Sequence, residues 1–230
     1  MSPASELLLQ QICDSVFPIG AYSHSFGLET FIQLGIVRDA DSAAAYVADQ
    51  IAYPLTYTEL LGMRLGYESA RHADMDALVA LELELQALKT PTEPRAAMNK
   101  LAARFIHTVS ELEVLDPEAA TFFSGYAVSQ RDHAVNVAYG ALAALADIDL
   151  APLMHRYLYS QVSAIVVNCV KTVPLSQTAG QQIITGSFSA METACDTALT
   201  CEATMLGLSC PGFDTRCIEH ETLYSRLYMS

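Results

Sequence analysis

Residues 39–55 read DADSAAAYVADQIAYPL, and this stretch decides the fold class. Asp39 or Asp41 can cap a helix, because a short carboxylate accepts hydrogen bonds from the free amides of a first helical turn. Apolar residues then recur at intervals of three and four, at Ala44, Val47, Ala48, Ile51 and Leu55. This spacing places them on one helical face. We therefore expect a long helix that runs to about Ser69, with a kink or a break at Pro54.

Helical spacing continues along nearly the whole chain, and no stretch alternates apolar and polar residues as a half-buried strand would. Further helices are expected at about residues 76–88, from the loop at Pro94 to about 115, from 116 onward, and at 134–146, 152–173 and 180–206. The sequence predicts an all-α protein, a single-domain bundle of about eight to ten helices. The core domain would span residues 1–207, and residues 208–230 would form a flexible C-terminal tail that docks a partner.

The composition limits the classes of function. Of the 230 residues, 52% are apolar and 17% are charged. This balance predicts additional buried surface of the kind that a subunit or partner interface provides. The formal net charge of −14 comes from 26 acidic and 12 basic residues. Because nucleic acids attract basic surfaces, we expect no nucleic-acid partner.

Three further observations bear on location. No apolar run reaches the roughly 18 residues that a membrane span needs. The first 20 residues contain no Lys or Arg, and the six cysteines show no CxxC spacing. These features indicate reduced thiols and no targeting segment. We therefore expect a cytoplasmic protein with no membrane partner.

Residues 17–29 read FPIGAYSHSFGLE and carry the main functional signal. Pro18 and Gly20 predict a rigid turn, and a helix should follow from about Ser23 to Leu34. One stripe of this helix is mainly apolar and predicts a core face, at His24, Leu28, Phe31 and Gly35. The opposite stripe mixes aromatic and polar side chains, at Tyr22, Phe26, Glu29 and Gln33. That mixture favours a protein–protein contact.

The sequence shows no constellation typical of a catalytic site. It lacks a phosphate-binding GxxxxGK[ST] loop, and Glu82 and Glu84 stand two residues apart. Residues at that spacing diverge on a helix, so we expect both carboxylates to be solvated. Cys217 and His220 have the spacing of metal ligands, and Cys210 precedes them. They form either a weak metal site or an exposed thiol beside a docking histidine.

The last eleven residues, 220–230, read HETLYSRLYMS. Leu223 pairs with Leu227, and Tyr224 pairs with Tyr228, at a spacing of four. Anchors at this spacing suit a short helix laid in a groove. From the residues alone, the tail either caps its own core or becomes ordered when a partner arrives.

Residues 17–29, the segment PLSQTAGQ at 174–181 and the tail at 220–230 together resemble the UreF family of urease accessory proteins. Residues 72–150 match the family more loosely, and residues 217–219 depart from it. The resemblance implies an all-α cytosolic homodimer that has no catalytic activity and no cofactor of its own. Such a protein bridges an accessory protein of the UreD/UreH type and the GTPase UreG. Nickel is the transient cargo, which the assembly delivers to apo-urease.

The pattern and the resemblance together assign three surfaces. The GTPase-binding residues are expected to be Tyr22, Phe26, Glu29 and Lys171. The homodimer interface is expected at Arg156 and Tyr159. Docking of the UreD/UreH partner is assigned to His220, Leu223, Tyr224, Arg226, Leu227 and Tyr228.

Two other functions stay open at this stage. One is a direct nickel-binding metallochaperone. The other is a helical metal-dependent enzyme that uses Cys210, Cys217 and His220.

Overall fold

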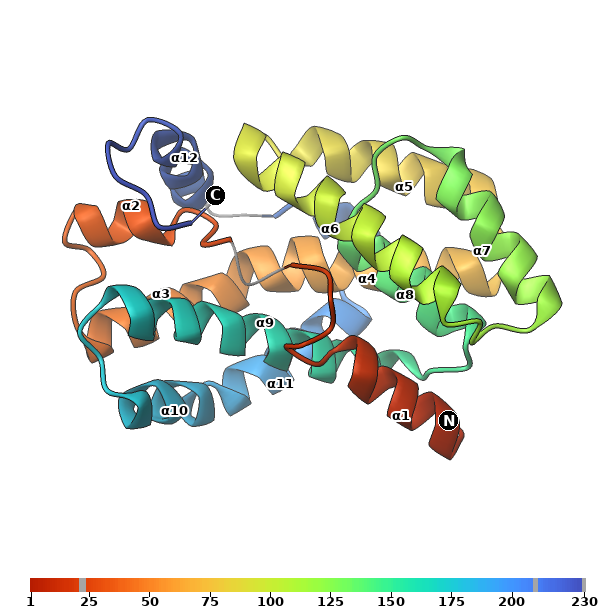
Figure 1. Cartoon of the computed structure of the whole chain (residues 1–230), viewed down its shortest axis with the longest axis horizontal. Helices are drawn as coiled ribbons and strands as arrows, with labels where there is room; N and C mark the ends of the chain where they lie inside the picture. The colour runs from red at the N-terminus through yellow and green to blue at the C-terminus, as the bar shows by residue number, and fades with distance from the viewer. Residues whose placement is uncertain (21–23, 209–210, 229–230) are drawn as a thin grey trace.

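The computed structural model describes residues 1–20, 24–208 and 211–228, and these form helices without strands (Figure 1). The all-α prediction is therefore confirmed. The first half contains α1 (Pro3–Ile12), α2 (Leu28–Gln33), α3 (Ala40–Gln50), the π-helix η2 (Ile51–Leu60), α4 (Leu61–Arg71), α5 (Met75–Leu88) and α6 (Thr92–Glu111). The second half contains α7 (Pro117–Ser129), α8 (Val135–Leu145), α9 (Leu150–Thr172), α10 (Gln177–Gly186), α11 (Phe188–Thr200), the 3-10 helix η3 (Ala203–Met205) and α12 (Pro211–His220).

The expected long helix is present and unbroken, as α3, η2 and α4 in succession. Asp39 caps it by accepting a hydrogen bond from the backbone N–H of Ser42 at 2.9 Å. Pro54 does not break the helix; it lies inside the π-helical stretch instead. Proline has no N–H to donate, so the α-helical hydrogen bond at its position is missing. A π-helical stretch, with bonds between residues five apart, lets the helix continue past it. The hydroxyl of Thr56 donates to the carbonyl of Ile51 within this stretch, at 2.5 Å.

Two expected helix boundaries are wrong. The helix expected at 180–206 is two helices, α10 and α11, that meet at Ser187. Gly186 has low helix propensity, and the hydroxyl of Ser187 donates to the carbonyl of Ile183 at 2.8 Å, which competes with a continuing helix. The helix expected from Ser23 begins at Leu28, because Phe26 and Gly27 have left-handed φ angles of 50° and 84°.

The centre of the molecule is a close contact between α4 and α8 (Figure 1). Every residue of α8 from Val135 to Ala144 is buried. A Cβ on Gly140 would lie 2.2 Å from the carbonyl oxygen of Met63, so the two backbones touch where only glycine fits. The helices α5, α6 and α7 lie beside this pair, and α2 and α12 lie together at one end of the molecule.

Candidate functional site at the junction of α2 and α12

The first and last motifs of the sequence meet in space. Helix α12 packs against α2 and α6, although nearly the whole chain separates α2 from α12 (Figure 1). The hydroxyl of Thr30 in α2 donates to the carbonyl of Arg216 in α12 at 2.9 Å. Gly27 faces Cys217, and a Cβ at Gly27 would lie 2.9 Å from the Cys217 sulfur. A glycine is therefore required where the two elements approach each other.

His220 is the centre of this junction. Its side chain is 0% exposed, and each ring nitrogen faces a carboxylate. Nε2 lies 3.0 Å from Oε2 of Glu29 in α2, and Nδ1 lies 2.7 Å from Oε2 of Glu93 in α6. Ionised carboxylates only accept hydrogen bonds, so this geometry suits a ring that donates from both nitrogens. Such charge-assisted bonds are stronger than neutral ones.

The residues after α12, 221–228, are here called the C-terminal segment. They form turns and bends rather than the expected short helix. The Glu29 carboxylate accepts the backbone N–H of Leu227 at 2.8 Å and of Tyr228 at 3.1 Å. Glu93 accepts from Nη1 of Arg226 at 2.5 Å. The segment is thus held through its backbone and Arg226. The backbone N–H groups of Leu227 and Tyr228 bond to a side chain instead of to the carbonyls of a helix.

Two further hydrogen bonds hold the segment, one at its start and one near its middle. The backbone N–H of Thr92, in the first turn of α6, donates to Oε1 of Glu221 at 3.2 Å. Nε2 of Gln33 donates to the carbonyl of Ser225 at 3.1 Å. The described part of the tail therefore docks on its own chain, which was one of the two alternatives that the sequence left open.

The expected docking residues differ in exposure. Tyr224 is fully exposed and Leu227 is 77% exposed. Leu223 and Tyr228 are half-buried, and burial raises the pKa of the Tyr228 hydroxyl, with the Glu29 carboxylate adding to the shift. The segment therefore presents two large apolar side chains to solvent while its backbone is held.

The four residues expected to meet the GTPase are not all on one open surface. Tyr22 lies outside the described residues, and Lys171 is exposed near the end of α9. Phe26 is half-buried. Glu29 is 6% exposed, so the prediction of an outward-facing stripe is wrong for this residue. The cause is the later helix start together with the donors of His220, Leu227 and Tyr228, which surround its carboxylate.

The residues expected at the homodimer interface lie on α9. Arg156 and Tyr159 are both exposed, and Tyr159 is among the exposed large hydrophobic residues of the described chain.

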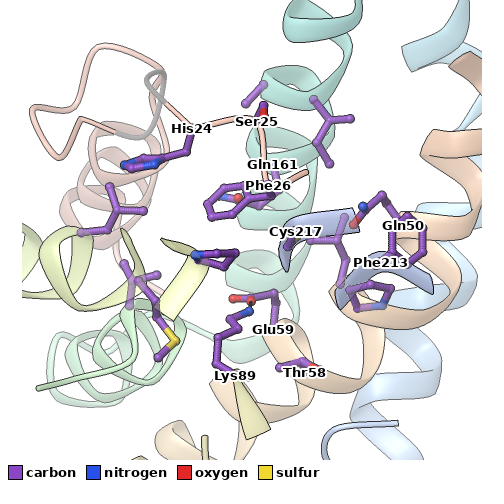
Figure 2. Close-up of a pocket in the computed structure, with 18 of the residues that line it drawn as sticks. His24, Ser25, Phe26, Gln50, Thr58, Glu59, Lys89, Gln161, Phe213 and Cys217 are labelled. Atoms are coloured by element: carbon purple, nitrogen blue, oxygen red, sulfur yellow. Dashed lines mark hydrogen bonds and ion pairs between the residues drawn. The ribbon is translucent and has the colours of Figure 1, made fainter. Parts of the chain in front are cut away.

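A cavity of about 180 Å³ lies beneath α12, lined by residues of η2, α6, α8, α9 and the segment before α2 (Figure 2). Glu59 and Lys89 point toward one another at one end, with Lys89 Nζ 3.0 Å from Glu59 Oε1. Burial acts to lower the pKa of Lys89, but the Glu59 carboxylate acts to raise it, together with smaller effects of Cys217 and Asp214, and the pKa is raised overall. Phe26 and His24 lie toward the other end, and burial lowers the pKa of His24.

Cys217 and His220, the two candidate metal ligands within the described residues, both have surroundings that do not favour a metal ion. Burial raises the pKa of the Cys217 thiol to about 12, which disfavours the thiolate that binds metals. Both nitrogens of His220 face carboxylates, and Cys210 lies outside the described residues. Among residues 1–20, 24–208 and 211–228, no group of three or more His, Cys, Asp or Glu side chains could hold a metal ion.

Sequence reasoning missed two carboxylates, the buried Glu82 and the partly exposed Glu93. Glu82 was expected to be solvated but is 1% exposed; it accepts from the Tyr126 hydroxyl at 2.5 Å and the backbone N–H of Ala134 at 2.6 Å. Its place in the apolar pattern of Leu78, Leu81 and Leu85 was the available signal. Glu93 gave no comparable signal, because its partners lie more than a hundred residues away.

A family model named UreF matches residues 37–187, which is more than half of the chain. The chain belongs to the UreF family. UreF proteins are urease accessory proteins, so this protein has a role in urease maturation. The matched region begins in the loop between α2 and α3 and ends just after α10. It includes residues 72–150, which resemble the family more loosely.

Within the described ranges, no helix combines the length and the apolar character that crossing a membrane requires.

Proposed function

We propose that this UreF-family protein is a non-catalytic scaffold that acts in the cytoplasm during urease maturation. It bridges a UreD/UreH-type accessory protein and a UreG-type GTPase, and it couples GTP hydrolysis to insertion of nickel into apo-urease. Nickel is the cargo of this assembly rather than a resident cofactor. Coupling requires that the scaffold bind one nucleotide state of the GTPase more tightly than the other.

The observation that carries the proposal is the presentation of Tyr224 and Leu227. Both side chains point into solvent, while the backbone at Leu227 is fixed by the buried Glu29. Tyrosine is enriched among the residues that dominate binding at protein interfaces, and burial of the exposed leucine would add apolar contact area. Because the segment is already ordered, a partner does not have to supply the full entropic cost of ordering it.

The test is a double variant, Tyr224→Ala with Leu227→Ala, in a pull-down by the UreD/UreH-type partner. We expect affinity to fall by about a hundredfold, since two buried anchors each contribute on the order of 1–2 kcal/mol. The matched control is Tyr53→Ala with Leu83→Ala, which removes an exposed tyrosine and an exposed leucine elsewhere on the surface, at 42% and 57% exposure. Equal retention of the partner by both double variants would contradict the proposal.

The GTPase contact is proposed at Tyr22, Phe26 and Lys171, with Glu29 acting indirectly. Because Glu29 is buried against the C-terminal segment, its contribution is to position that segment next to the motif. Tyr22→Ala should weaken recruitment of the GTPase while the UreD/UreH-type partner stays bound. Loss of both partners together would show that Tyr22 supports the fold rather than the GTPase contact.

The homodimer is proposed to form through α9, around Arg156 and Tyr159. Exposed apolar side chains on α9 and α11, Tyr159, Val167 and Phe188, support this location, because burial of such side chains between subunits is favourable.

A further inference from the structure

Helix α6 presents a row of basic side chains to solvent. The buried ring of Phe105 packs on that of Phe17, with centroids 6.0 Å apart, and this contact fixes the apolar face of the helix toward the core. Lys100, Arg104 and His107 follow one another on a different face, at spacings of four and three residues, and all three are exposed. Residues at these spacings lie one above the next along a helix. The three side chains therefore form a line.

An open groove of about 500 Å³ lies beside this row and is here called the α6 groove. The three basic residues form one wall. Ile19 and His24, from the segment before α2, and Leu101 and Ala103 of α6 also line it. Ile19 is half-buried and Ala103 is exposed, so apolar surface accompanies the basic side chains. Within the described residues, no acidic side chain lines the groove.

The two cations of the groove have no acidic partner in the part of the chain that the structure describes. Six of the twelve Lys and Arg side chains lie within 4.0 Å of a carboxylate there, but Lys100 and Arg104 do not. At one end of the row, Glu93 is already bonded to residues of the junction. At the other end, the exposed Glu111 lies one turn beyond His107. The positive charge is therefore not neutralised by a carboxylate contact within the described residues.

Lys100 also acts on the inner wall of the groove. The side chain of His24 is 7% exposed there. Burial lowers the pKa of His24 and Lys100 lowers it further, while Glu93 opposes the shift. His24 is therefore mainly neutral at pH 7 and adds no charge to that of Lys100 and Arg104.

The shape of the row favours an extended chain over a compact anion. Cβ atoms four residues apart on a helix are separated by about 5–6 Å. Side chains on one face of an extended peptide repeat at about 6.6 Å, because each residue rises about 3.3 Å. Carboxylates at alternate positions of such a peptide can therefore meet Lys100 and Arg104 in turn. A single phosphate is bound instead by groups that converge on one point.

The charge of the whole protein limits the size of the ligand. With a net charge of −14, the protein repels large polyanions such as nucleic acids and anionic membranes. A short acidic segment responds mainly to charges within the screening length of about 8–10 Å. Two neighbouring cations without acids between them attract such a segment even on an acidic protein.

We propose that the α6 groove binds an extended acidic segment of a partner protein, with carboxylates at alternate positions on Lys100 and Arg104. Apolar side chains of the same segment pack on Ile19 and Ala103. This site lies outside the three surfaces assigned above and does not depend on the proposed bridging. Its failure would therefore leave that proposal standing.

The experiment selects peptides from a random dodecapeptide phage library on the full-length protein. Selected peptides should be enriched in Asp and Glu at alternate positions. One of them is then synthesised with a fluorophore, and its affinity is measured by fluorescence anisotropy. Lys100→Gln with Arg104→Gln should weaken binding by about tenfold, because two contacts between exposed charges are lost.

The matched control is Arg38→Gln with Arg131→Gln, which removes two exposed arginines at other sites and should leave the affinity unchanged. A second measurement leaves the protein unaltered: replacement of each acidic residue of the peptide by its amide should also weaken binding by about tenfold. Inorganic phosphate should displace the peptide no better than chloride at the same ionic strength.

Three outcomes would overturn the proposal. One is selection of peptides without acidic enrichment. Another is an equal loss of affinity in the two double variants, which would indicate attraction by overall charge rather than by the groove. The last is displacement of the peptide by phosphate at concentrations at which chloride has no effect, because the groove would then be a site for a compact anion.

Discussion

The contact between α4 and α8 and the junction between α2 and α12 bring distant residues together by opposite means. At the α4–α8 contact, small residues let two backbones touch, and every residue of α8 from Val135 to Ala144 is buried. At the junction, hydrogen bonds join the buried His220 to the buried Glu29 and to the partly exposed Glu93, which also holds Arg226. Dense apolar packing gives a contact that persists, whereas polar bonds that water can replace give one that can be exchanged for a partner.

The largest expected effect comes from Gly140→Ala in the α4–α8 contact. The added Cβ would lie 2.2 Å from the Met63 carbonyl oxygen, so the helices must separate. We expect a loss of about 3 kcal/mol or more of unfolding free energy, measured by chemical denaturation. The control is Gly125→Ala in α7, where the nearest atom is 3.7 Å away and the gain in helix propensity should stabilise slightly. Equal effects at the two glycines would contradict the close contact.

The next effect is at Glu82, beside the core. Glu82→Leu removes the acceptor of the Tyr126 hydroxyl and of the Ala134 N–H, and it leaves both donors buried and unpaired. Unfolding free energy should fall by about 2–4 kcal/mol. Glu84→Leu, at an exposed position of the same helix, should change it by less than about 0.5 kcal/mol. A Glu82 variant as stable as the Glu84 variant would mean that Glu82 is solvated, as the sequence alone predicted.

A smaller effect is expected at the junction. Arg226→Ala removes the contact with Glu93, and both side chains of this ion pair are partly exposed. Global stability should fall by less than about 1 kcal/mol, because exposed ion pairs contribute little. For a chain of this size that corresponds to a melting-temperature shift of at most about 2–4 °C. A loss comparable to that of Gly140→Ala would remove the distinction between the two regions.

The smallest effect is the pH dependence of Asp214 on α12. Burial raises the pKa of its carboxyl above the usual 3.8, although Lys89 opposes the shift. The folded state then binds a proton more tightly than the unfolded state, so this residue's contribution to stability is lost as pH rises from 3.8 through the raised pKa. Asp214→Asn should therefore stabilise the protein by a few tenths of a kcal/mol at pH 7, with no gain at pH 3. Melting curves at the two pH values measure this effect. Destabilisation by Asp214→Asn at pH 7 would contradict a raised pKa of Asp214 in the folded state.

The two regions were also unequally predictable from the sequence. Helices of the central framework could be located, because apolar spacing and capping residues are local signals. Asp39 and Asp116 cap α3 and α7 in the structure. The spacing of Glu82 and Glu84 predicts two solvated carboxylates, but Glu82 belongs to the apolar stripe of α5 and is buried.

At the junction, the importance of the first and last motifs was predictable, but their contact was not. The hydrogen bonds that join Glu29 to Leu227 and His220 to Glu93 connect residues 198 and 127 positions apart. No local pattern specifies such pairs. The left-handed backbone at Phe26 likewise depends on tertiary packing, because a bulky residue such as phenylalanine rarely adopts a positive φ angle.

The most direct test of the account is amide hydrogen exchange of the full-length protein, alone and with the UreD/UreH-type partner. In the free protein, the amides of α12 and residues 221–228 should exchange much faster than those of α4 and α8. Addition of the partner should slow exchange at residues 221–228 and leave α4 and α8 unchanged. Protection that is unaltered at residues 221–228, or that changes first in α4 and α8, would contradict the assignment of recognition to the junction.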